Sequence, residues 1–533
     1  TSVWPPGVEA SRGGRVSVTG VNFQVPGVAE EVSVAAGEVG TLVRPRVVGR
    51  GEVAADCAEQ VVLAEGPQAV EPAADAGDDA RHANLMSAPG GVSGRVGRDG
   101  DVDCYRFAAR RGQPLILETY AQRLGTALDP MLEILDARGL PVSRVVLRPL
   151  AETNTTFRDH DATAAGIRIT NWDEFAVGDL VMIGREVTRI EQLPRNPDDD
   201  CRLISRKGRR VALFGTTPEH HVNGQPFVKV EAIPASSRSE TSSRAEGVGA
   251  VVLPYRNDDG GPEFGKDSYL WFDPPADGEY IARVSDARGQ GGAGHVYHLV
   301  ARTPRPDFRA SLSPSHVNIR RGGTSLINVA VDRTDGFAGA IDLEVEGLPA
   351  GVHAVAEPVE AGSYASTIGF WADAEAAPQS KATWHVTARA SASASDASGR
   401  VPARSRTLGG GWVTIVREPN LAVTATPTAV ALKPGGEARL TLRVERRNGF
   451  AGRVPIDVVN LPEGVRVLDV GLNGVLIPEG QSERVLVLRA ERWAAAGTRR
   501  FYATGKAEAA GTSDASRPIT LTVEPASPRH ASK

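Results

Sequence analysis

The sequence predicts an all-β fold: a multidomain string of β-sandwiches with a small β module inserted into one of them. Short runs of alternating apolar and polar residues recur along the chain, which is the pattern of half-buried strands. The 58 glycines and 36 prolines supply the turns that separate such runs. A set of motifs also recurs at a fixed spacing in the C-terminal half, which indicates two copies of one domain.

Length and composition limit the classes of protein that fit. A chain of 533 residues is too long for one hydrophobic core and predicts about three or four domains. The formal net charge is −5, from 60 basic and 65 acidic residues, which argues against a nucleic-acid-binding protein. No apolar run approaches the roughly 20 residues that a membrane-spanning helix needs, so no transmembrane segment is predicted.

Residues 1–66 form the first predicted domain. Val16 and Val18 alternate with polar residues, and the GVNF segment at 20–23 turns the chain into a new strand. The Pro-Gly, Arg-Gly and Thr-Gly steps of this region resemble the small immunoglobulin-like domains of the IPT/TIG type. The resemblance implies another compact β-sandwich.

The stretch 99–136 carries the clearest strand pattern. Tyr105 and Phe107 alternate with other residues, a turn follows, and Leu115 and Leu117 continue the alternation. Strand, turn and strand at this spacing are typical of a β-sandwich. Only about half the strands of a sandwich are present here, so the remainder is expected later in the chain.

Two sets of motifs carry a family resemblance. GDVD-x-YRF and LDP-x-L-x-x-LDA-x-G lie within 99–136, and DSYLWF and PADGEY follow at 267–280. In this order they resemble the bacterial pre-peptidase C-terminal domain, which implies a jelly-roll-like β-sandwich, usually an accessory module of secreted enzymes and surface proteins. The implied sandwich is split into residues 67–150 and 236–305.

Residues 151–235 then form the inserted β module. Its GD-x-x-x-IG-x-E motif predicts a tight hairpin around the Gly-Arg step at 184–185. The motif, followed by GT and H-x-x-G, resembles small β modules of phage-tail-like and envelope proteins. A Ser-rich stretch at 235–247 is predicted to be a flexible return to the sandwich.

An internal repeat occupies the C-terminal part. The GFAG motif at 336–339 recurs at 449–452, and the LP-x-GV motif at 348–352 recurs at 461–465 with the same offset. An offset of this size fits an immunoglobulin-like sandwich, and the units resemble the immunoglobulin-like repeats of bacterial surface proteins. Phe337 and Phe450 occupy one motif position, so both are expected to be core anchors. The predicted boundaries are 306–418 and 419–525, with a disordered tail at 526–533.

One acidic group is a candidate calcium site. Asp101 and Asp103 alternate in the GDVD turn, and carboxylate oxygens are the ligands that calcium prefers. In collagen-binding relatives of the resembled family, a linker carboxylate and this turn hold calcium, which implies Glu71, Asp101 and Asp103 here. Ala73 and Ala74 stand where that family has two more ligands, and Asp78 or Asp79 are the candidates to compensate. A solvated turn without metal is the favoured alternative.

No catalytic or cofactor-binding residue is predicted. The GVSG segment at 91–94 lacks the spacing of a nucleophile elbow and precedes a strand. His220 and His221 would point to opposite faces of a strand, so they are interpreted as a loop pair and not as ligands of one metal. Tyr269 and Trp271 would share one strand face, either in the core or as a carbohydrate platform.

The cysteines predict little chemistry. Cys57, Cys104 and Cys201 contain no CxxC pair, which excludes zinc-ribbon and thioredoxin-type sites. Cys104 lies in a predicted strand and is expected to be a small buried residue. A Cys57–Cys104 disulfide is the alternative that the odd count permits.

The expected function follows from the resemblances. They imply a non-catalytic, extracytoplasmic protein of the bacterial cell envelope, secreted, surface-bound or periplasmic, with a structural or adhesive role. Its expected partners are proteins or polysaccharides at the cell surface, or other copies of itself. The alternatives are the accessory region of a secreted protease or other hydrolase whose catalytic domain lies elsewhere, and a carbohydrate- or matrix-protein-binding module.

Overall fold

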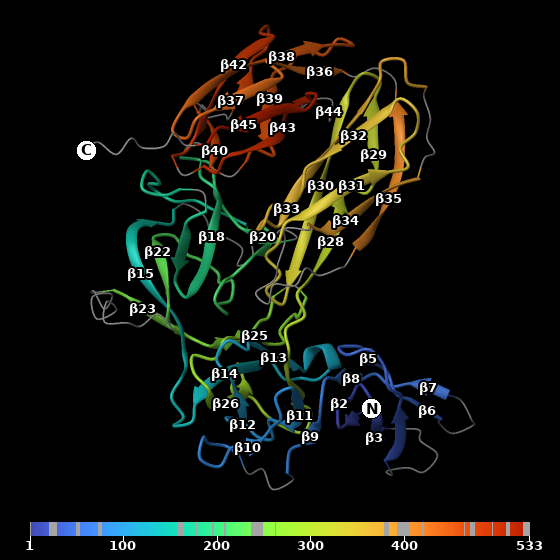
Figure 1. Cartoon of the computed structure of the whole chain (residues 1–533), viewed down its shortest axis with the longest axis vertical. Helices are drawn as coiled ribbons and strands as arrows, with labels where there is room; N and C mark the ends of the chain where they lie inside the picture. Colours follow the sequence, from blue (N-terminus) through green and yellow to red (C-terminus); the bar gives the residue numbers. More distant parts are fainter. Residues whose placement is uncertain are drawn as a thin grey trace. The chain divides into compact units, whose positions relative to one another are not determined.

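The computed structural model describes residues 2–525 with internal gaps (Figure 1). The gaps are 21–28, 49–53, 73–76, 157–164, 177, 195–196, 207–208, 236–248, 262, 378–382, 392–404, 417–419, 463, 469–474, 493 and 508–511. Within the described ranges the single helix is a 3-10 turn, η1 (Gln122–Leu124), and all other elements are strands. The predicted all-β fold class is therefore confirmed. No helix in these ranges is long and apolar enough to cross a membrane. The predicted disordered tail and most of the predicted Ser-rich return lie outside them.

The chain forms two compact units. The first contains residues 1–175, 179–190 and 203–305, and the second contains residues 306–533 with 176–178 and 191–202. The first unit holds the N-terminal sheets, the split sandwich and most of the insert. The second holds the two repeats.

The N-terminal part of the first unit contains three small sheets. One has the order β1 (Ser2–Trp4), β3 (Gly14–Thr19) and β4 (Glu30–Val34), and another the order β2 (Gly7–Glu9), β8 (Val61–Ala64) and β5 (Leu42–Val43). The third pairs β6 (Arg46–Val48) with β7 (Ala54–Asp56). Val16 and Val18 are fully buried in the core of this part, as their alternation predicts.

The sandwich that follows combines strands from two distant stretches of sequence. Its first sheet has the order β10 (Asn84–Leu85), β12 (Val102–Ala109), β26 (Gly278–Asp286), β14 (Pro130–Asp136) and β24 (Arg256–Asn257). Its second sheet has the order β25 (Tyr269–Phe272), β13 (Leu115–Tyr120), β27 (Val296–Arg302), β11 (Gly90–Arg95) and β9 (Gln68–Val70). In both sheets late strands lie between or beside early ones, so neither stretch of sequence can complete a sheet alone. The core between them includes Tyr105, Phe107, Leu117, Phe272 and Tyr297.

The insert forms a sheet of seven strands. Their order is β16 (Gly166–Ile167), β19 (Cys201–Leu203), β18 (Glu186–Gln192), β17 (Leu180–Ile183), β22 (Pro226–Pro234), β15 (Ser143–Asn154) and β23 (Val251–Pro254). A short hairpin of β20 (Ser205–Arg206) and β21 (Arg209–Arg210) accompanies it. Ile183 pairs with Glu186, which places the predicted tight hairpin at 184–185.

The boundaries predicted at residues 150 and 236 need correction. β15 begins at Ser143 and pairs with β22 and β23, so residues 143–150 and 251–254 belong to the sheet of the insert. The sandwich ends at Val142 and resumes at Tyr255, where the Tyr255 N–H donates to the Val142 carbonyl at 2.9 Å. Both residues lie in the sandwich core. Sequence patterns do not mark this point, because the apolar run at 145–147 would fit a strand of either sheet.

We expect that replacing residues 143–254 with a short Gly-Ser turn leaves a soluble, cooperatively unfolding sandwich. The hydrogen bond between Val142 and Tyr255 holds the two cut ends together, so a short turn can join them. The variant is checked by circular dichroism and thermal unfolding. Its control is the shorter deletion of 152–235, which removes β22 and strips β15 of a partner. A better-folded shorter deletion would contradict the boundary at Val142 and Tyr255.

The described strands of the two repeats follow one shared order, to which the second repeat adds two strands at one sheet. In the first, one sheet has the order β28 (Asp307–Ser313), β30 (Thr324–Thr334), β33 (Ala365–Ala372) and β32 (Val352–Ala356), and the other the order β29 (Val317–Arg320), β35 (Ser405–Val416), β34 (Thr383–Ala390) and β31 (Ile341–Glu346). In the second, one sheet has the order β36 (Leu421–Thr426), β38 (Glu437–Arg446), β42 (Glu483–Ala490) and β40 (Val465–Leu468). The other has the order β37 (Ala429–Leu432), β45 (Ile519–Val523), β43 (Gly497–Ala507), β39 (Val454–Val459) and β41 (Val475–Ile477), with β44 (Thr512–Ala515) beside β43. Equivalent strands support the repeat read from the sequence.

An arginine organises the GFAG turn in both repeats. Arg333 donates hydrogen bonds to the carbonyls of Ser363 and Glu360 at 2.9 and 2.8 Å, and another to the Gly339 carbonyl. Arg446 occupies the same position of the second repeat and donates to the carbonyls of Gly452 and Pro478, each at 2.8 Å. Each guanidinium group thus joins the GFAG turn to a second turn, near Ser363 in the first repeat and near Pro478 in the second.

The prediction that Phe337 and Phe450 are equivalent core anchors is wrong for Phe450. Phe337 is 2% exposed and stacks on Phe308 with ring centroids 5.6 Å apart. Phe450 is only partly buried against its core. The position that corresponds to Phe308 in the second repeat is Leu421, which offers no ring for stacking.

Candidate functional site

The three predicted calcium ligands lie at one edge of the split sandwich. Glu71 follows β9, Asp101 lies in the turn before β12, and Asp103 is in β12. Asp101 and Asp103 are 3% and 1% exposed, so the solvated turn favoured from the sequence is wrong for both. Asp103 is buried because its side chain faces Tyr297 of the opposite sheet.

Two tyrosines join Glu71 to Asp103. The Tyr297 hydroxyl donates to Asp103 Oδ2 at 2.6 Å, and the Tyr105 hydroxyl donates to Glu71 Oε1 at 3.1 Å. The two hydroxyl oxygens lie 2.7 Å apart. Tyr105 lies two residues after Asp103 on the same strand face, so the sequence contained a signal for it. Tyr297 comes from β27, and nothing in the sequence pattern indicated its place here.

Backbone N–H groups hold two further carboxylate oxygens of this group. The Arg95 N–H donates to Glu71 Oε2 at 3.0 Å, and the Gly97 N–H donates to Asp101 Oδ2 at 2.7 Å. Arg98 Nη2 lies 3.3 Å from Asp101 Oδ1 and 2.6 Å from Asp78 Oδ2. Arg98 therefore lies between Asp78 and Asp101, so Asp78 is not placed as a further ligand beside Asp101.

Burial raises the pKa of Asp103 to about 8, and the charges on Glu71 and Asp101 and a hydrogen bond shared with Glu71 act in the same direction. The hydrogen bond from Tyr297 opposes the rise. Two carboxyl groups held this close cannot both ionise cheaply, so the pair retains a proton at neutral pH. The hydroxyls of Tyr105 and Tyr297 connect the segment after β9 to β12.

We expect the stability of the sandwich to fall as the pH rises from about 4 to about 8 because of Asp103. Its pKa is raised from 3.8 to about 8 on folding. Between these values the folded state holds a proton that the unfolded state has lost, so rising pH favours unfolding. Asp103→Asn cannot ionise, and the stability difference between variant and wild type should shift in favour of the variant as the pH rises.

The difference is measured by urea denaturation of both proteins at pH 5 and pH 8. Subtracting the unfolding free energy of the wild type from that of the variant cancels the contributions of the other titrating groups. One of these is His298, whose pKa is lowered to about 3 by burial. The contribution of Asp259 also cancels. Burial and the charges of Asp258 and Asp129 raise the pKa of Asp259 to about 6. A difference that stays constant between the two pH values would contradict a shared proton.

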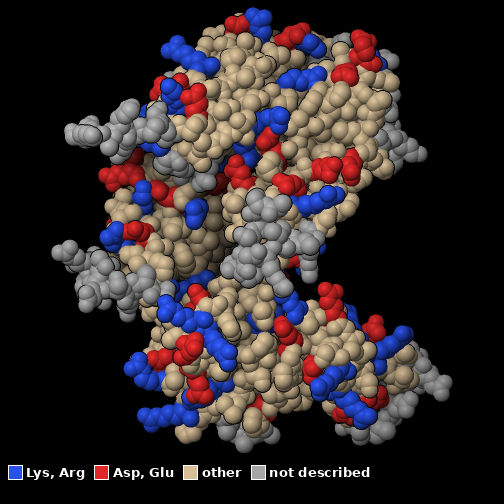
Figure 2. Space-filling model, viewed as in Figure 1, with Lys and Arg blue, Asp and Glu red and all other residues tan. Residues whose placement is uncertain are grey.

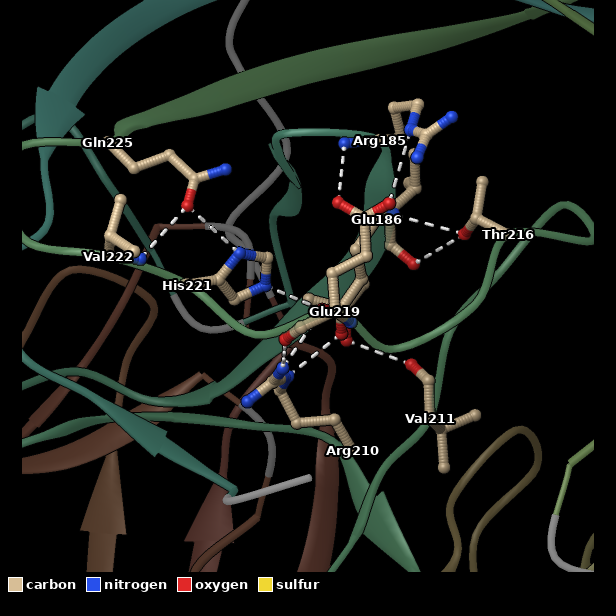
Figure 3. Close-up of polar contacts among 11 residues, drawn as sticks. Arg185, Glu186, Arg210, Val211, Thr216, Glu219, His221, Val222 and Gln225 are labelled. Atoms are coloured by element: carbon tan, nitrogen blue, oxygen red, sulfur yellow. Dashed lines mark hydrogen bonds and ion pairs between the residues drawn. The ribbon is translucent and has the colours of Figure 1, made fainter. Parts of the chain in front are cut away.

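A second buried polar cluster lies in the insert (Figure 3). Glu186 is on β18, and its Oε1 accepts from Arg210 Nε at 2.8 Å while its Oε2 lies 2.6 Å from His221 Nε2. The Glu219 N–H also donates to Oε2, at 3.0 Å. The side chains of Glu186, Arg210 and His221 are fully buried. Burial would raise the pKa of Glu186, but hydrogen bonds from His221 and Arg210 and the charge of Arg210 lower it below its usual value.

The histidine pair is therefore only partly as predicted. His220 is exposed and His221 is buried, so the two do point apart. His221 is not a free loop residue, because its Nδ1 lies 3.2 Å from Gln225 Oε1 while its Nε2 meets Glu186. The sequence placed Glu186 in the hairpin motif but offered no signal that Arg210 and His221 would reach it.

A serine and a histidine meet inside the split sandwich. Ser93 Oγ lies 2.9 Å from His298 Nδ1, and His298 Nε2 lies 2.9 Å from Gln68 Oε1. Both Ser93 and His298 are fully buried, and a side chain at Gly7 would overlap the His298 ring. The backbone at Gly7 thus covers the pair. In a catalytic triad a carboxylate orients the histidine, whereas here the second ring nitrogen of His298 contacts the side-chain amide of Gln68. Ser93, His298 and Gln68 thus join three adjacent strands, β11, β27 and β9, through their side chains.

The cysteines and the aromatic residues of β25 were the remaining candidates from the sequence. Cys57, Cys104 and Cys201 are free and buried, so the alternative of a Cys57–Cys104 disulfide is wrong. Tyr269 and Trp271 are half-buried on one face of β25, while Phe272 lies in the core on the other, as alternation predicts. Among the described residues, no group of three or more His, Cys, Asp or Glu side chains is arranged to hold a metal ion.

Comparison with protein-family models found no match, and comparison with curated proteins found none. Among solved structures, domains 5-6 of the S-layer protein SbsC are 12% identical with a TM-score of 0.19, covering 41% of this chain and 99% of that one. The D00-D0 domain of intimin is 14% identical with a TM-score of 0.16, covering 40% and 100%. The fibronectin(III)-like modules of Clostridium thermocellum CbhA are 14% identical with a TM-score of 0.13, covering 42% and 99%. Similarities this weak assign the chain neither a family nor a function, and the fold rests on its own strand pairings.

Proposed function

We propose that this protein is a non-catalytic structural or adhesive component of a bacterial cell envelope, located outside the cytoplasm. The observation that carries the non-catalytic role is that polar side chains of the kinds used in catalysis contact one another inside the fold. The pairs Ser93 with His298, Glu186 with Arg210, and Glu71 with Asp103 each join strands or segments that are distant in sequence. Groups committed to such joints stabilise the fold, which supports a structural role.

The surface supports the same role. On the face drawn in Figure 2, basic and acidic side chains are interspersed, in keeping with the net charge of −5. A mixed surface gives no electrostatic preference for a polyanion. The proposed partners are surface proteins or polysaccharides, or other copies of the chain.

The location is tested on intact cells of the source organism with an added protease. Digestion of the protein in intact cells, while a cytoplasmic marker survives, is the expected result. Protection until lysis would overturn an exposed location, and release on outer-membrane permeabilisation alone would place the protein in the periplasm. The full-length reading frame separates the structural role from an accessory region of a secreted hydrolase, because a catalytic domain beside Thr1 would favour the hydrolase.

A carbohydrate-binding role is the second candidate, and the half-buried Tyr269 and Trp271 favour it. Aromatic rings on one strand face can stack against sugars. A glycan array with the wild type and Trp271→Ala tests this role, with Tyr280→Phe as a variant on a core ring. Binding that Trp271→Ala alone abolishes supports it, and an array without binding removes it.

The calcium site also stays a proposal. Its carboxylates must release the proton shared by Glu71 and Asp103 before they can take a cation. We expect millimolar calcium to raise the melting temperature of the wild type more at pH 8.5 than at pH 6.5, and not to change that of Asp101→Ala/Asp103→Ala. Melting in chelator gives the baseline. An unchanged wild-type melting temperature at both pH values would rule the site out.

A further inference from the structure

The two repeats meet at a close contact within the second unit. Tyr502 on β43 is fully buried, and a Cβ atom added to Gly369 on β33 would overlap its hydroxyl oxygen and Cζ. Ile368 and Phe370 point into the core of the first repeat, so Gly369 lies on the outer face of that sheet. Glycine thus leaves a slot on this face that the Tyr502 ring occupies.

Polar contacts surround the slot. The Asp514 carboxylate of the second repeat accepts from the N–H of Thr324 at 3.2 Å and from the N–H of Val423 at 3.0 Å. One buried carboxylate therefore binds backbone of both repeats. Arg500 pairs with Glu357 at 3.0 Å across the same contact.

Further contacts complete the rim. Arg499 pairs with Glu360 at 2.8 Å, and Arg517 donates to the Ala372 carbonyl at 3.1 Å. The Arg517 guanidinium also lies over the Trp371 ring, 5.5 Å from its centroid. In each ion pair one side chain, Arg499 or Glu357, is largely buried. A buried charge that loses its partner is costly, so these pairs favour a single arrangement of the two repeats.

Strand register identifies the equivalent of the slot in the second repeat. The repeated LP-x-GV motif places Val352 opposite Val465, and these residues pair with Ala372 in the first repeat and Ala490 in the second. Gly369 lies three residues before Ala372, so its equivalent is Val487. Leu486 and Leu488 point into the core, so Val487 occupies the outer face where the first repeat has the slot.

The tyrosine has an equivalent too. The same motif alignment places Leu343 opposite Ile456, and these residues pair with Ala388 and Gly505. Tyr502 lies three residues before Gly505, so its equivalent in the first repeat is His385. The first repeat thus has the slot without the tyrosine, and the second has the tyrosine without the slot.

We propose that the outer face of β33 is a docking surface for one kind of partner, a sandwich that carries a tyrosine at the position of Tyr502, and that this contact cannot continue to a third repeat. Gly369 admits the ring, and Val487 closes the same place on the second repeat. The joint between the repeats is therefore directional, and the outer face of β42 in the second repeat cannot accept a further tyrosine in the same way. This inference does not depend on the location or adhesive role proposed above.

The test measures the distance between the repeats in the full chain. Nitroxide labels are attached to Ser311→Cys and Arg439→Cys, two exposed positions, and the native thiols are all buried. We expect one narrow distance in the wild type. Gly369→Val should replace it with a broad distribution, because the valine side chain expels the Tyr502 ring.

Gly369→Val is expected to fold, because the second repeat has valine at this very position of the same strand. Tyr502→His, the residue of the first repeat, tests the joint from the other side and should also broaden the distribution. Val487→Gly is the matched control and should keep the wild-type distance. Circular dichroism checks that each variant is folded.

Three results would overturn the proposal. A broad distribution in the wild type would mean that no fixed joint exists. The narrow wild-type distance in folded Gly369→Val or in folded Tyr502→His would show that the slot does not hold the joint. Equal broadening by Val487→Gly would show that loosening is not specific to the slot.

Discussion

Glu186→Ala is expected to destabilise the insert by about 3–5 kcal/mol, the usual cost of removing one partner from a buried ion pair. Arg210 loses its carboxylate partner, and His221 loses the acceptor of its Nε2 contact. All three side chains are fully buried, so water cannot replace the missing carboxylate. Hydrogen exchange of the amides in β17, β18 and β22 measures the loss locally, which a global transition of a multidomain chain would obscure.

Glu231→Ala is the matched control for this prediction. Glu231 lies on β22 of the same sheet and pairs with Arg148, but its side chain is 47% exposed. An exposed ion pair contributes about 0–1 kcal/mol, so this variant should exchange almost as slowly as the wild type. Similar losses at Glu186 and Glu231 would mean that the buried cluster has no special weight. A replacement of Glu186, Arg210 and His221 together by apolar residues should cost less than Glu186→Ala, because it leaves no charge unpaired.

Phe337→Ala is expected to cost the first repeat about 3–5 kcal/mol, the range for truncating a buried phenylalanine. The ring is 2% exposed, stacks on Phe308 and has the Arg333 guanidinium 5.3 Å from its centroid. Truncation leaves a cavity that the rigid turn cannot close. Phe450→Ala removes the same ring from the same motif position but from a partly exposed site, so its cost should be clearly smaller.

Hydrogen exchange of the strands that flank each GFAG turn measures both variants. The comparison is internal, because the two residues have the same chemistry and the same place in the repeat. Equal losses would show that Phe450 is as fully packed as Phe337. A negligible loss at Phe337 would show that its surroundings collapse onto the space it leaves.

The sequence by itself determined the features that depend on neighbouring residues. Alternation fixes which side chains share a face, so the burial of Val16 and Val18 and the two faces of β25 followed from it. The constant offset between the GFAG and LP-x-GV motifs likewise revealed two domains of one fold, because a repeated motif is visible without knowing any contact. The spacing of Asp101 and Asp103 placed two carboxylates near each other in the chain, but the calcium that it predicted stays a prediction.

Tertiary structure alone decided the features that depend on register between distant strands. Glu186 meets Arg210 and His221 because β21 and the segment that follows it return to β18. The split sandwich ends at Val142 because β15 leaves to pair with β22 and β23. The space beside Gly369 is filled by the ring of Tyr502, a residue of the other repeat, which no local pattern around Gly369 could indicate. Local pattern cannot fix such pairings, because the same alternating strand fits several neighbours and only the packed chain selects one.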